Sequence, residues 1–298
     1  MVETNALTVY YGRQRGIDGL DMQVRAGEVY GFLGPNGSGK TTTLRVLLDL
    51  VRPTGGRATV FGLDCRRQGV AIRRRTGYLP GELSLYPQLR AEQFLTMVNA
   101  VRGRPAARQD IGRLCERLGL DASRRMRTYS RGNKQKVGLV AAFMGQPELL
   151  LLDEPTSGLD PLVQQTVLEL VREARSDGRT VLLSSHVLSE VQAVCDRVGI
   201  IRDGRLATVE RVADLIQSRL HRLTLRLGRV PPEGAFQRDG AREVARHGPV
   251  VTLEVREGLD GVLTEALRHG VLELETHPVS LEEIFMEHYD TGRGRGDG

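Results

Sequence analysis

Residues 34–41 read GPNGSGKT, a glycine-rich turn that follows an apolar run and precedes a run with helical periodicity. The pattern G-x-x-x-x-G-K-[ST] in that setting predicts a loop whose backbone N–H groups surround a phosphate. We expect its glycines to adopt backbone conformations that other residues avoid. A helix that begins near Lys40 adds the positive end of its dipole. The loop therefore predicts a nucleoside triphosphate site, and the structural alternative is a glycine-rich turn that arose by chance.

The last residues of the loop carry its chemistry. Lys40 can reach the β- and γ-phosphates as a point charge, and the hydroxyl of Thr41 can bind Mg²⁺. Only three of the 42 basic residues are lysines, so a lysine here indicates that a compact ammonium is required. The residues predicted to bind nucleotide in this segment are Gly34, Pro35, Asn36, Gly37, Ser38, Gly39, Lys40, Thr41 and Thr42.

Charge, cysteine content and the lengths of the apolar runs limit the kinds of partner, cofactor and cellular location that the chain can have. The net charge of +5 comes from an arginine-rich composition, so it is weak evidence for a nucleic-acid or anionic-lipid partner. Three scattered cysteines argue against a disulfide framework or a zinc site, and a reducing compartment fits them better. We expect no signal peptide, because the first residues lack a basic leader before an apolar stretch. No run approaches the ~18 apolar residues that span a bilayer, so we expect a soluble chain whose membrane role depends on a partner.

The order of apolar runs predicts a parallel α/β sheet. Runs such as LLLL at 149–152 lack polar alternation, as strands do when both faces of the sheet are covered. Helical periodicity appears over 41–51 and from about 161 to 176, and another helix begins near 187. The strands expected from apolar runs lie at 6–12, 20–24, 28–34, 58–62, 76–80, 149–154, 180–185 and 199–209.

The chain divides near residue 218, where its character changes. Residues 1–218 are expected to form the nucleotide-binding part, with a mainly helical subdomain at about 88–146. Residues 219–289 predict a small α+β domain, whose runs include HRLTLRLG, VVTLEVRE and a final SLEEIFMEHY. The glycine- and arginine-rich tail at 290–298 is expected to be disordered.

Two acidic residues directly follow one of the apolar runs. Asp153 and Glu154 follow LLLL, so they lie at the carboxyl end of a buried strand, where open α/β sheets hold their ligands. Adjacent side chains on a strand point to opposite sides, so the two acids can have separate roles. We expect Asp153 to lie in the metal shell and Glu154 to polarise a water for in-line attack on the γ-phosphate. The structural alternative is a solvated strand edge or a helix N-cap.

A histidine ends the next strand. His186 follows TVLLSS and is expected at the same sheet edge as Glu154, within reach of the γ-phosphate or the attacking water. A single histidine is more often structural or exposed. We give that interpretation to the five others, all in the C-terminal part: His221, His247, His269, His277 and His288.

Taken in order, these motifs resemble the ATP-binding subunit of an ABC (ATP-binding cassette) transporter over residues 5–210. Tyr11 falls where that family stacks an aromatic ring on adenine, although Tyr11 could also be an ordinary strand aromatic. TGYLPGELSLYPQL (76–89) resembles the Q-loop and YSRGNKQ (129–135) the signature motif. LLLLDE, SGLD (157–160) and His186 resemble the Walker B strand, the D-loop and the switch histidine. The C-terminal pattern resembles the accessory domain of a bacterial drug and antibiotic export subgroup.

Two positions depart from the family pattern. The Q-loop glutamine position holds Gly81, which has no side chain to approach a metal, so only the location of the loop is carried over. The signature segment, residues 130–133, reads SRGN where the family has SGGQ. Arg131 in it either adds a charge contact or lies outward. The residues assigned to the signature are Ser130, Arg131, Gly132 and Asn133.

The resemblance implies a P-loop ABC ATPase fold: a RecA-like parallel-sheet core, an antiparallel β-subdomain and a helical subdomain, followed by the small α+β accessory domain. It implies ATP and Mg²⁺ as cofactors, with Thr41 and, through water, Asp153 near the metal. Two copies would pack head to tail with ATP between them, and Asp160 would lie at their interface besides capping a helix. A separate transmembrane permease would hold the cassette at the cytoplasmic face of the membrane.

The predicted function is ATP hydrolysis that powers export of a small molecule such as a drug, an antibiotic or a lipid-like compound. The alternative is a soluble ABC-type ATPase that acts on nucleic acid or the ribosome. Against it, the chain has one cassette and no long coiled-coil insertion, so no specific nucleic acid is expected. A GTPase or small-molecule kinase would share the phosphate loop, but the chain lacks the Asn-Lys-x-Asp pattern for guanine.

Overall fold

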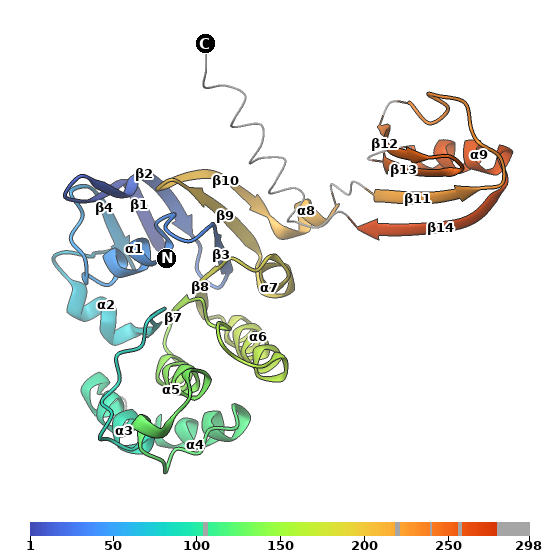
Figure 1. The fold of residues 1–298 in the computed structure, drawn as a ribbon. Helices are drawn as coiled ribbons and strands as arrows, with labels where there is room; N and C mark the ends of the chain where they lie inside the picture. Colours follow the sequence, from blue (N-terminus) through green and yellow to red (C-terminus); the bar gives the residue numbers. More distant parts are fainter. Residues whose placement is uncertain (104–106, 218–220, 239, 256–257, 279–298) are drawn as a thin grey trace. The chain divides into compact units, whose positions relative to one another are not determined.

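The computed structural model describes residues 1–103, 107–217, 221–238, 240–255 and 258–278. The chain forms two compact units, Met1–Val212 and Ala213–Gly298 (Figure 1). The tail predicted at 290–298 and the final run SLEEIFMEHY at 280–289 lie outside the described residues.

The first unit is built on a six-stranded sheet in the order β10-β9-β3-β8-β7-β6. The strands from β9 to β6 run parallel, and β10 pairs antiparallel with β9 at the edge. Every residue of β3, β7 and β8 is buried, which explains the unbroken apolar runs. The strands are β3 (Val29–Leu33), β6 (Thr76–Leu79), β7 (Leu149–Asp153), β8 (Thr180–Ser185), β9 (Arg197–Arg202) and β10 (Arg205–Arg211).

A second sheet in the same unit is antiparallel, in the order β2-β1-β4-β5. Helix α1 (Lys40–Leu47) contacts both β2 and β4 of this sheet and β7 of the parallel one. Buried side chains of α1 and of both sheets form one hydrophobic cluster. The phosphate loop is therefore carried by a helix anchored between two sheets. The antiparallel strands are β1 (Val2–Tyr11), β2 (Gln14–Val24), β4 (Gly55–Val60) and β5 (Leu63–Asp64).

Helix α1 ends four residues before the predicted end at residue 51. Asp49 has a positive φ of 56°, and the N–H groups of Leu50 and Val51 bond back to the carbonyl of Arg45. The backbone therefore closes into a turn, although the apolar periodicity continues to Val51. Periodicity reports burial, and it does not report where the helical hydrogen bonds stop.

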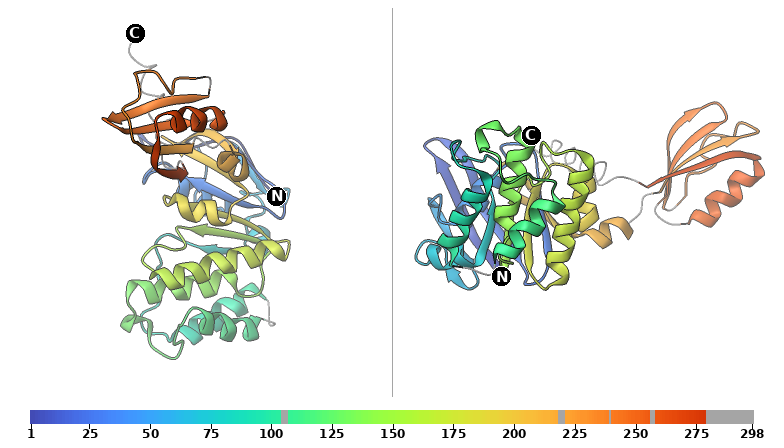
Figure 2. Two further views of the ribbon diagram at one scale, coloured as in Figure 1. Left: turned by 90° about the vertical axis from the view of Figure 1, so that its right-hand side faces the viewer. Right: turned by 90° about the horizontal axis from the view of Figure 1, so that it is seen from below.

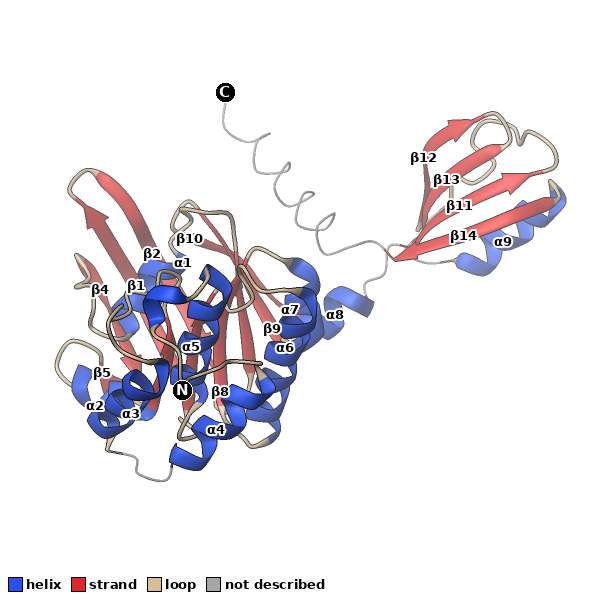
Figure 3. Ribbon diagram, turned by 60° about the horizontal axis from the view of Figure 1, so that its bottom comes forward, coloured by secondary structure: helices blue, strands red, loops and turns tan. Residues whose placement is uncertain are grey.

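Helices cover the parallel sheet and form a separate group beside it. Helices α5 (Arg131–Phe143), α6 (Pro161–Ser176) and α7 (Leu188–Val194) contact strands of the parallel sheet (Figure 3). Helices α3 (Ala91–Arg102) and α4 (Ala107–Arg117) pack on α5, with a 3₁₀ turn at Met126–Thr128 before it. The mainly helical character predicted for residues 88–146 is thus observed.

One helix of the first unit was not predicted. The arginines at 73–75, expected between two strands, form the last turn of α2 (Gly69–Arg75). Cations are favourable at that end of a helix because the carbonyl groups there are unpaired and the helix dipole is negative. The segment is short and its apolar residues are few, so no helical period could be seen.

The second unit is a four-stranded antiparallel sheet, β12-β13-β11-β14, with α9 (Leu259–Arg268) packed on it (Figure 2). Its core consists of alternate residues of β11 and β13 with Val262, Ala266 and Phe236. Strand β12, with the sequence AREVARH, was not predicted because it has few apolar residues. The other elements are α8 (Val212–Gln217), β11 (His221–Leu227), β12 (Ala241–His247), β13 (Val250–Val255) and β14 (Val271–Pro278).

Two further expectations concerned the cysteines and the absence of a membrane-spanning segment. Cys65, Cys115 and Cys195 are all buried and unpaired, and burial raises the pKa of the Cys65 thiol to about 12. Among the residues that the structure describes, no helix combines the length and the apolar character needed to cross a membrane.

The buried strand β7 offers a test of the core. Leu151 is fully buried and pairs with Tyr78 on one side and Leu182 on the other. Leu151→Ala should lower the free energy of unfolding by ~2–5 kcal/mol, because it removes apolar contact and leaves a cavity. Urea denaturation followed by circular dichroism measures the change. Leu162→Ala is the control, because Leu162 is 76% exposed; an equal loss in both variants would contradict the placement of β7.

Candidate functional site

The phosphate loop joins β3 to α1, and its glycines serve two different purposes. Gly37 and Gly39 have positive φ values of 81° and 110°, which glycine adopts readily. Gly34 does not, so the conformational reason predicted for it is wrong. A Cβ atom at Gly34 would lie 2.3 Å from the carbonyl oxygen of Ile201 and 2.7 Å from Ser38 Oγ. Glycine is required there because the loop packs directly against β9.

Lys40 lies inside the loop that it closes. It is only 5% exposed, and its Nζ donates to the carbonyls of Gly34 at 2.6 Å and Pro35 at 3.1 Å. Burial lowers the pKa of Lys40, and the carboxylates of Glu154 and Asp153 act in the opposite direction. A positive charge is therefore held beside the loop amides, in an arrangement suited to a polyanion.

Asp153 connects the loop to the sheet. Thr41 Oγ1 donates to Asp153 Oδ2 at 2.7 Å, and Ser184 Oγ donates to Asp153 Oδ1 at 2.6 Å. The residue is 1% exposed, so each carboxylate oxygen has a donor in place of water. This placement rules out the solvated strand edge that was the structural alternative for Asp153.

Glu154 leaves the strand in a way that alternation did not predict. Strand β7 ends at Asp153, and Glu154 has a φ of +48°. Left-handed backbone in a residue other than glycine costs of order 1–3 kcal/mol and concentrates at functional sites. The separation of the two acids thus comes from this turn and not from strand alternation. The turn brings Glu154 Oε1 to 3.2 Å from His186 Nδ1, beyond the end of β8.

A cavity of about 230 Å³ adjoins the loop and holds most of the predicted nucleotide-binding residues. Tyr11 lies in its wall, 48% exposed, with its hydroxyl 3.4 Å from Thr42 Oγ1. Glu154 also lines the cavity. The cavity is also lined by Gln14, Arg15 and Gly16 at the start of β2. The sequence analysis did not single them out, because nothing in this stretch indicates a ligand.

The signature segment does not line this cavity. Ser130 is the N-cap of α5 and accepts from the N–H of Asn133 at 3.3 Å. Arg131 is exposed, and its side chain lies beside Gly158; a Cβ atom on Gly132 would lie 2.9 Å from the carbonyl of Gly158. The signature segment thus packs on the loop at 157–160 of its own chain.

Asp160 caps the N-terminus of helix α6, as the sequence predicts. Its carboxylate accepts from the N–H of Val163 at 3.1 Å, and Pro161 occupies the first position of α6. Proline is favourable there because the helix leaves that N–H unpaired in any case.

Two residues that the sequence analysis missed hold the acids in place. Ser184 bonds Asp153 and also accepts from the N–H of Glu154 at 3.1 Å. Gln135, on α5, donates to the carbonyls of Glu154 and Pro155, both at 3.2 Å. Their hydrogen-bond partners are 19 to 31 residues away, so no local pattern could have revealed these contacts, although Gln135 ends the YSRGNKQ segment.

The residues around Asp153 fit a magnesium ion. A hydroxyl and a carboxylate 2.7 Å apart are hard oxygen donors, which Mg²⁺ prefers. Across the described part of the chain no three His, Cys, Asp or Glu residues cluster. Mg²⁺ is usually held by one or two protein groups together with phosphates and water. Gly81 also approaches, because a Cβ atom there would lie 3.0 Å from Asp153 Oδ2.

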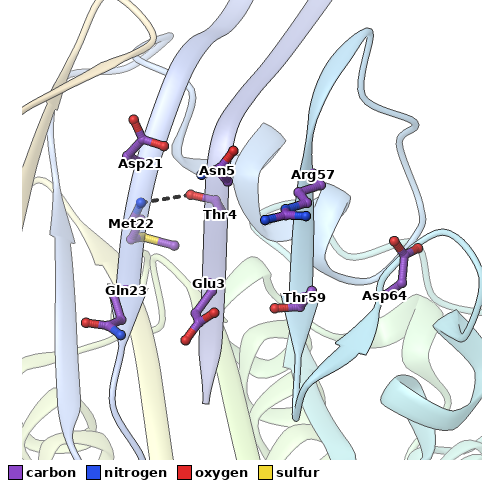
Figure 4. Close-up of a pocket in the computed structure, with 9 residues that line it drawn as sticks. All are labelled: Glu3, Thr4, Asn5, Asp21, Met22, Gln23, Arg57, Thr59 and Asp64. Atoms are coloured by element: carbon purple, nitrogen blue, oxygen red, sulfur yellow. Dashed lines mark hydrogen bonds between the residues drawn. The ribbon is translucent and has the colours of Figure 1, made fainter.

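A larger cavity, of about 660 Å³, opens on the antiparallel sheet (Figure 4). Its polar groups serve the fold: Asp21 accepts from the N–H of Ala6, and Asp64 accepts from the N–H groups of Arg66 and Arg67. It contains none of the predicted site residues, so the candidate site is the smaller cavity at the phosphate loop.

Comparisons with known proteins agree on one family. Residues 17–157 match the family model described as "ABC transporter". The bacitracin transport ATP-binding protein BcrA of Bacillus licheniformis is 38% identical over 209 residues, which is 69% of this chain and 68% of that protein. The linearmycin resistance ATP-binding protein LnrL of Bacillus subtilis is 31% identical over 303 aligned residues, 96% of this chain and 97% of that protein.

A solved structure shows the same fold. MJ0796, described as a bacterial ABC transporter cassette with a dimeric structure, has a TM-score of 0.64 and 22% identity. The match covers 71% of this chain and 99% of that one. The expected ABC ATPase fold of the cassette is therefore confirmed.

The packing of Gly34 gives the test of the loop. Gly34→Ala should weaken ATP binding at least tenfold, because the new methyl group would collide with the Ile201 carbonyl and displace the loop. Gly112→Ala is the matched control, since Gly112 has open space around it on α4. Titration with a fluorescent ATP analogue measures both. Unchanged affinity in Gly34→Ala would refute the close approach.

Proposed function

The chain belongs to the ABC transporter family as an ATP-binding subunit and is an ATPase, and we propose that its ATP hydrolysis powers export of a small molecule through a separate permease. The relatives named for bacitracin transport and linearmycin resistance support a drug-like or antibiotic cargo. They also favour transport over action on nucleic acid or the ribosome. The observation that carries the mechanism is the meeting of Glu154 and His186 beside the phosphate loop.

We assign the hydrolytic step to those two residues. Glu154 takes a proton from a water molecule as the water oxygen attacks the γ-phosphorus in line. The bond from the γ-phosphorus to the bridging oxygen breaks, so the products are ADP and inorganic phosphate. His186 orients Glu154 through the 3.2 Å contact and reaches toward the γ-phosphate.

The loop binds the rest of the triphosphate. Backbone N–H groups of Gly34 and of residues 36–42 and the ammonium of Lys40 face the phosphates, and Tyr11 stacks on adenine. Thr41 and, through water, Asp153 would hold Mg²⁺, which when bound neutralises charge on the β- and γ-phosphates. Replacement of Lys40 by alanine removes the buried cation and should abolish most nucleotide affinity.

The signature segment needs a second copy. It does not reach its own cavity, so we place it on the nucleotide of a partner packed head to tail. Ser130, the Gly132 N–H and the positive end of α5 would then face the γ-phosphate, with Arg131, Asn133 and Asp160 at the same interface. ADP lacks the γ-phosphate that would bridge the two copies, so ATP favours the closed dimer and ADP does not.

An apolar groove supports a permease partner. The cavity, of about 690 Å³, is lined on its open side by Leu50, Val70, Tyr86 and Val101, which are 55–80% exposed. Exposed apolar side chains gathered in a groove mark interaction sites. Tyr86 belongs to the 76–89 segment, which also carries Gly81 beside Asp153. The groove therefore links a partner to the site, and the partner would hold the cassette at the cytoplasmic face of the membrane.

Glu154→Gln tests the hydrolytic role. The variant should bind ATP with wild-type affinity, lose about 10²-fold or more of its turnover and accumulate an ATP-dependent dimer, because the amide cannot accept the proton. Phosphate release and size-exclusion chromatography with light scattering measure the two effects. Lys40→Ala is the control that should lose both binding and dimer. Equal turnover in Glu154→Gln and wild type would remove Glu154 from the role of base.

Val70→Asp tests the groove. A charge on this 61% exposed residue should abolish co-purification with the permease and its effect on ATPase rate, while ATP affinity of the isolated subunit stays unchanged. Val230→Asp, at a residue 62% exposed in the second unit, is the matched control. Full assembly of the Val70→Asp variant with the permease would place the partner elsewhere.

A further inference from the structure

The backbone of Glu154 is held in a conformation that it would not adopt unaided. Its φ of +48° lies in the left-handed region, which only glycine adopts routinely. The direction of the Glu154 side chain is determined by the backbone conformation of this turn. The position of the proposed base therefore depends on the groups that hold this turn.

Hydrogen bonds from three elements hold the turn. The N–H of Glu154 faces Ser184 on β8, donating to its carbonyl at 3.2 Å and its Oγ at 3.1 Å. The carbonyl of Glu154 accepts from the N–H of Ser157 at 3.1 Å and from Gln135 Nε2 at 3.2 Å. Gln135 also donates to the carbonyl of Pro155 at 3.2 Å. Its side-chain amide thus fixes two successive peptide groups, one of them that of Glu154.

The side chain of Gln135 is buried where helix α5 meets the turn at Glu154. It is 8% exposed, and a buried amide retains its place by making these bonds. It also lies on α5, whose N-cap is Ser130. One helix therefore carries both the segment proposed to face the partner's nucleotide and the side chain that holds the turn at Glu154.

We propose that Gln135 is a positioning residue for ATP hydrolysis, which holds the Glu154 turn so that the carboxylate stays beside His186 and the γ-phosphate. This inference rests on the proposed role of Glu154 as the base. Because α5 is a continuous helix, a displacement of its N-terminus by a second copy also moves the Gln135 amide. The orientation of the base in one copy is thereby linked to the engagement of the other.

Two substitutions separate positioning from packing. Gln135→Met keeps the length and most of the volume but removes both donated bonds. Gln135→Glu keeps the shape and places an acceptor against two carbonyl oxygens, unless the introduced carboxyl is protonated and can donate. Gln165→Met is the matched control, because Gln165 is exposed on α6 and its side chain has no hydrogen bond within the described part of the chain.

The main measurement is ATPase kinetics of full-length protein, with ATP affinity and thermal midpoint measured alongside. We expect Gln135→Met to lower kcat about tenfold while KM and ATP affinity stay within about twofold. In a Glu154→Gln background, Gln135→Met should lower the residual turnover no further, because a residue that acts through Glu154 has nothing left to position. A decrease of the same factor in both backgrounds would show a general packing role and overturn the proposal.

The second measurement is the pH profile of Gln135→Glu. Its rate relative to wild type should rise as the pH falls, because the protonated carboxyl can donate one of the lost bonds. A flat ratio together with a wild-type rate in Gln135→Met would overturn the proposal. Failure of the proposed function is distinct: it would appear as unchanged turnover in Glu154→Gln alone, whatever the variants of Gln135 do.

Discussion

The buried carboxylate of Asp153 is the contact on which the site depends. It accepts from Thr41 at the end of the phosphate loop and from Ser184 on the neighbouring strand. A charge this deeply buried is tolerated only when donors replace water. The loop, β7 and β8 are therefore held together by a polar contact as well as by apolar packing, and anything that displaces Asp153 displaces the loop.

The parallel register determines what else can meet at this point. Asp153 pairs with Ser184 across β7 and β8, so the residues that follow the two strands, Glu154 and His186, emerge at one edge. The strand β3 lies next to β8 and delivers the phosphate loop to the same edge. Three connections that are remote in sequence thus converge because parallel strands end together.

The sequence predicted the parts of this site that are formed by short, contiguous motifs. The phosphate loop, the acids after a buried strand and the Asp160–Pro161 cap are short patterns whose chemistry does not depend on distant residues. The close packing of Gly34 on Ile201, the turn at Glu154 and the bonds from Ser184 and Gln135 were not predictable. Each depends on which strands and helices become neighbours, and one sequence contains no direct record of that.

Helix α5 has a buried part that packs in the core and a first turn that lies at the surface. Its buried face, from Val137 to Phe143, fixes it against the sheet and the neighbouring helices, while its first turn remains at the surface with Ser130 and Arg131. Gln135 lies where the buried face begins and contacts the backbone after β7. The first turn of α5 packs on the loop at 157–160, and it can respond to a charged ligand at the surface while the buried half of the helix stays folded. The helix itself connects that surface to Glu154, and the last step of the connection is the hydrogen bond from the side-chain amide of Gln135 to the Glu154 carbonyl.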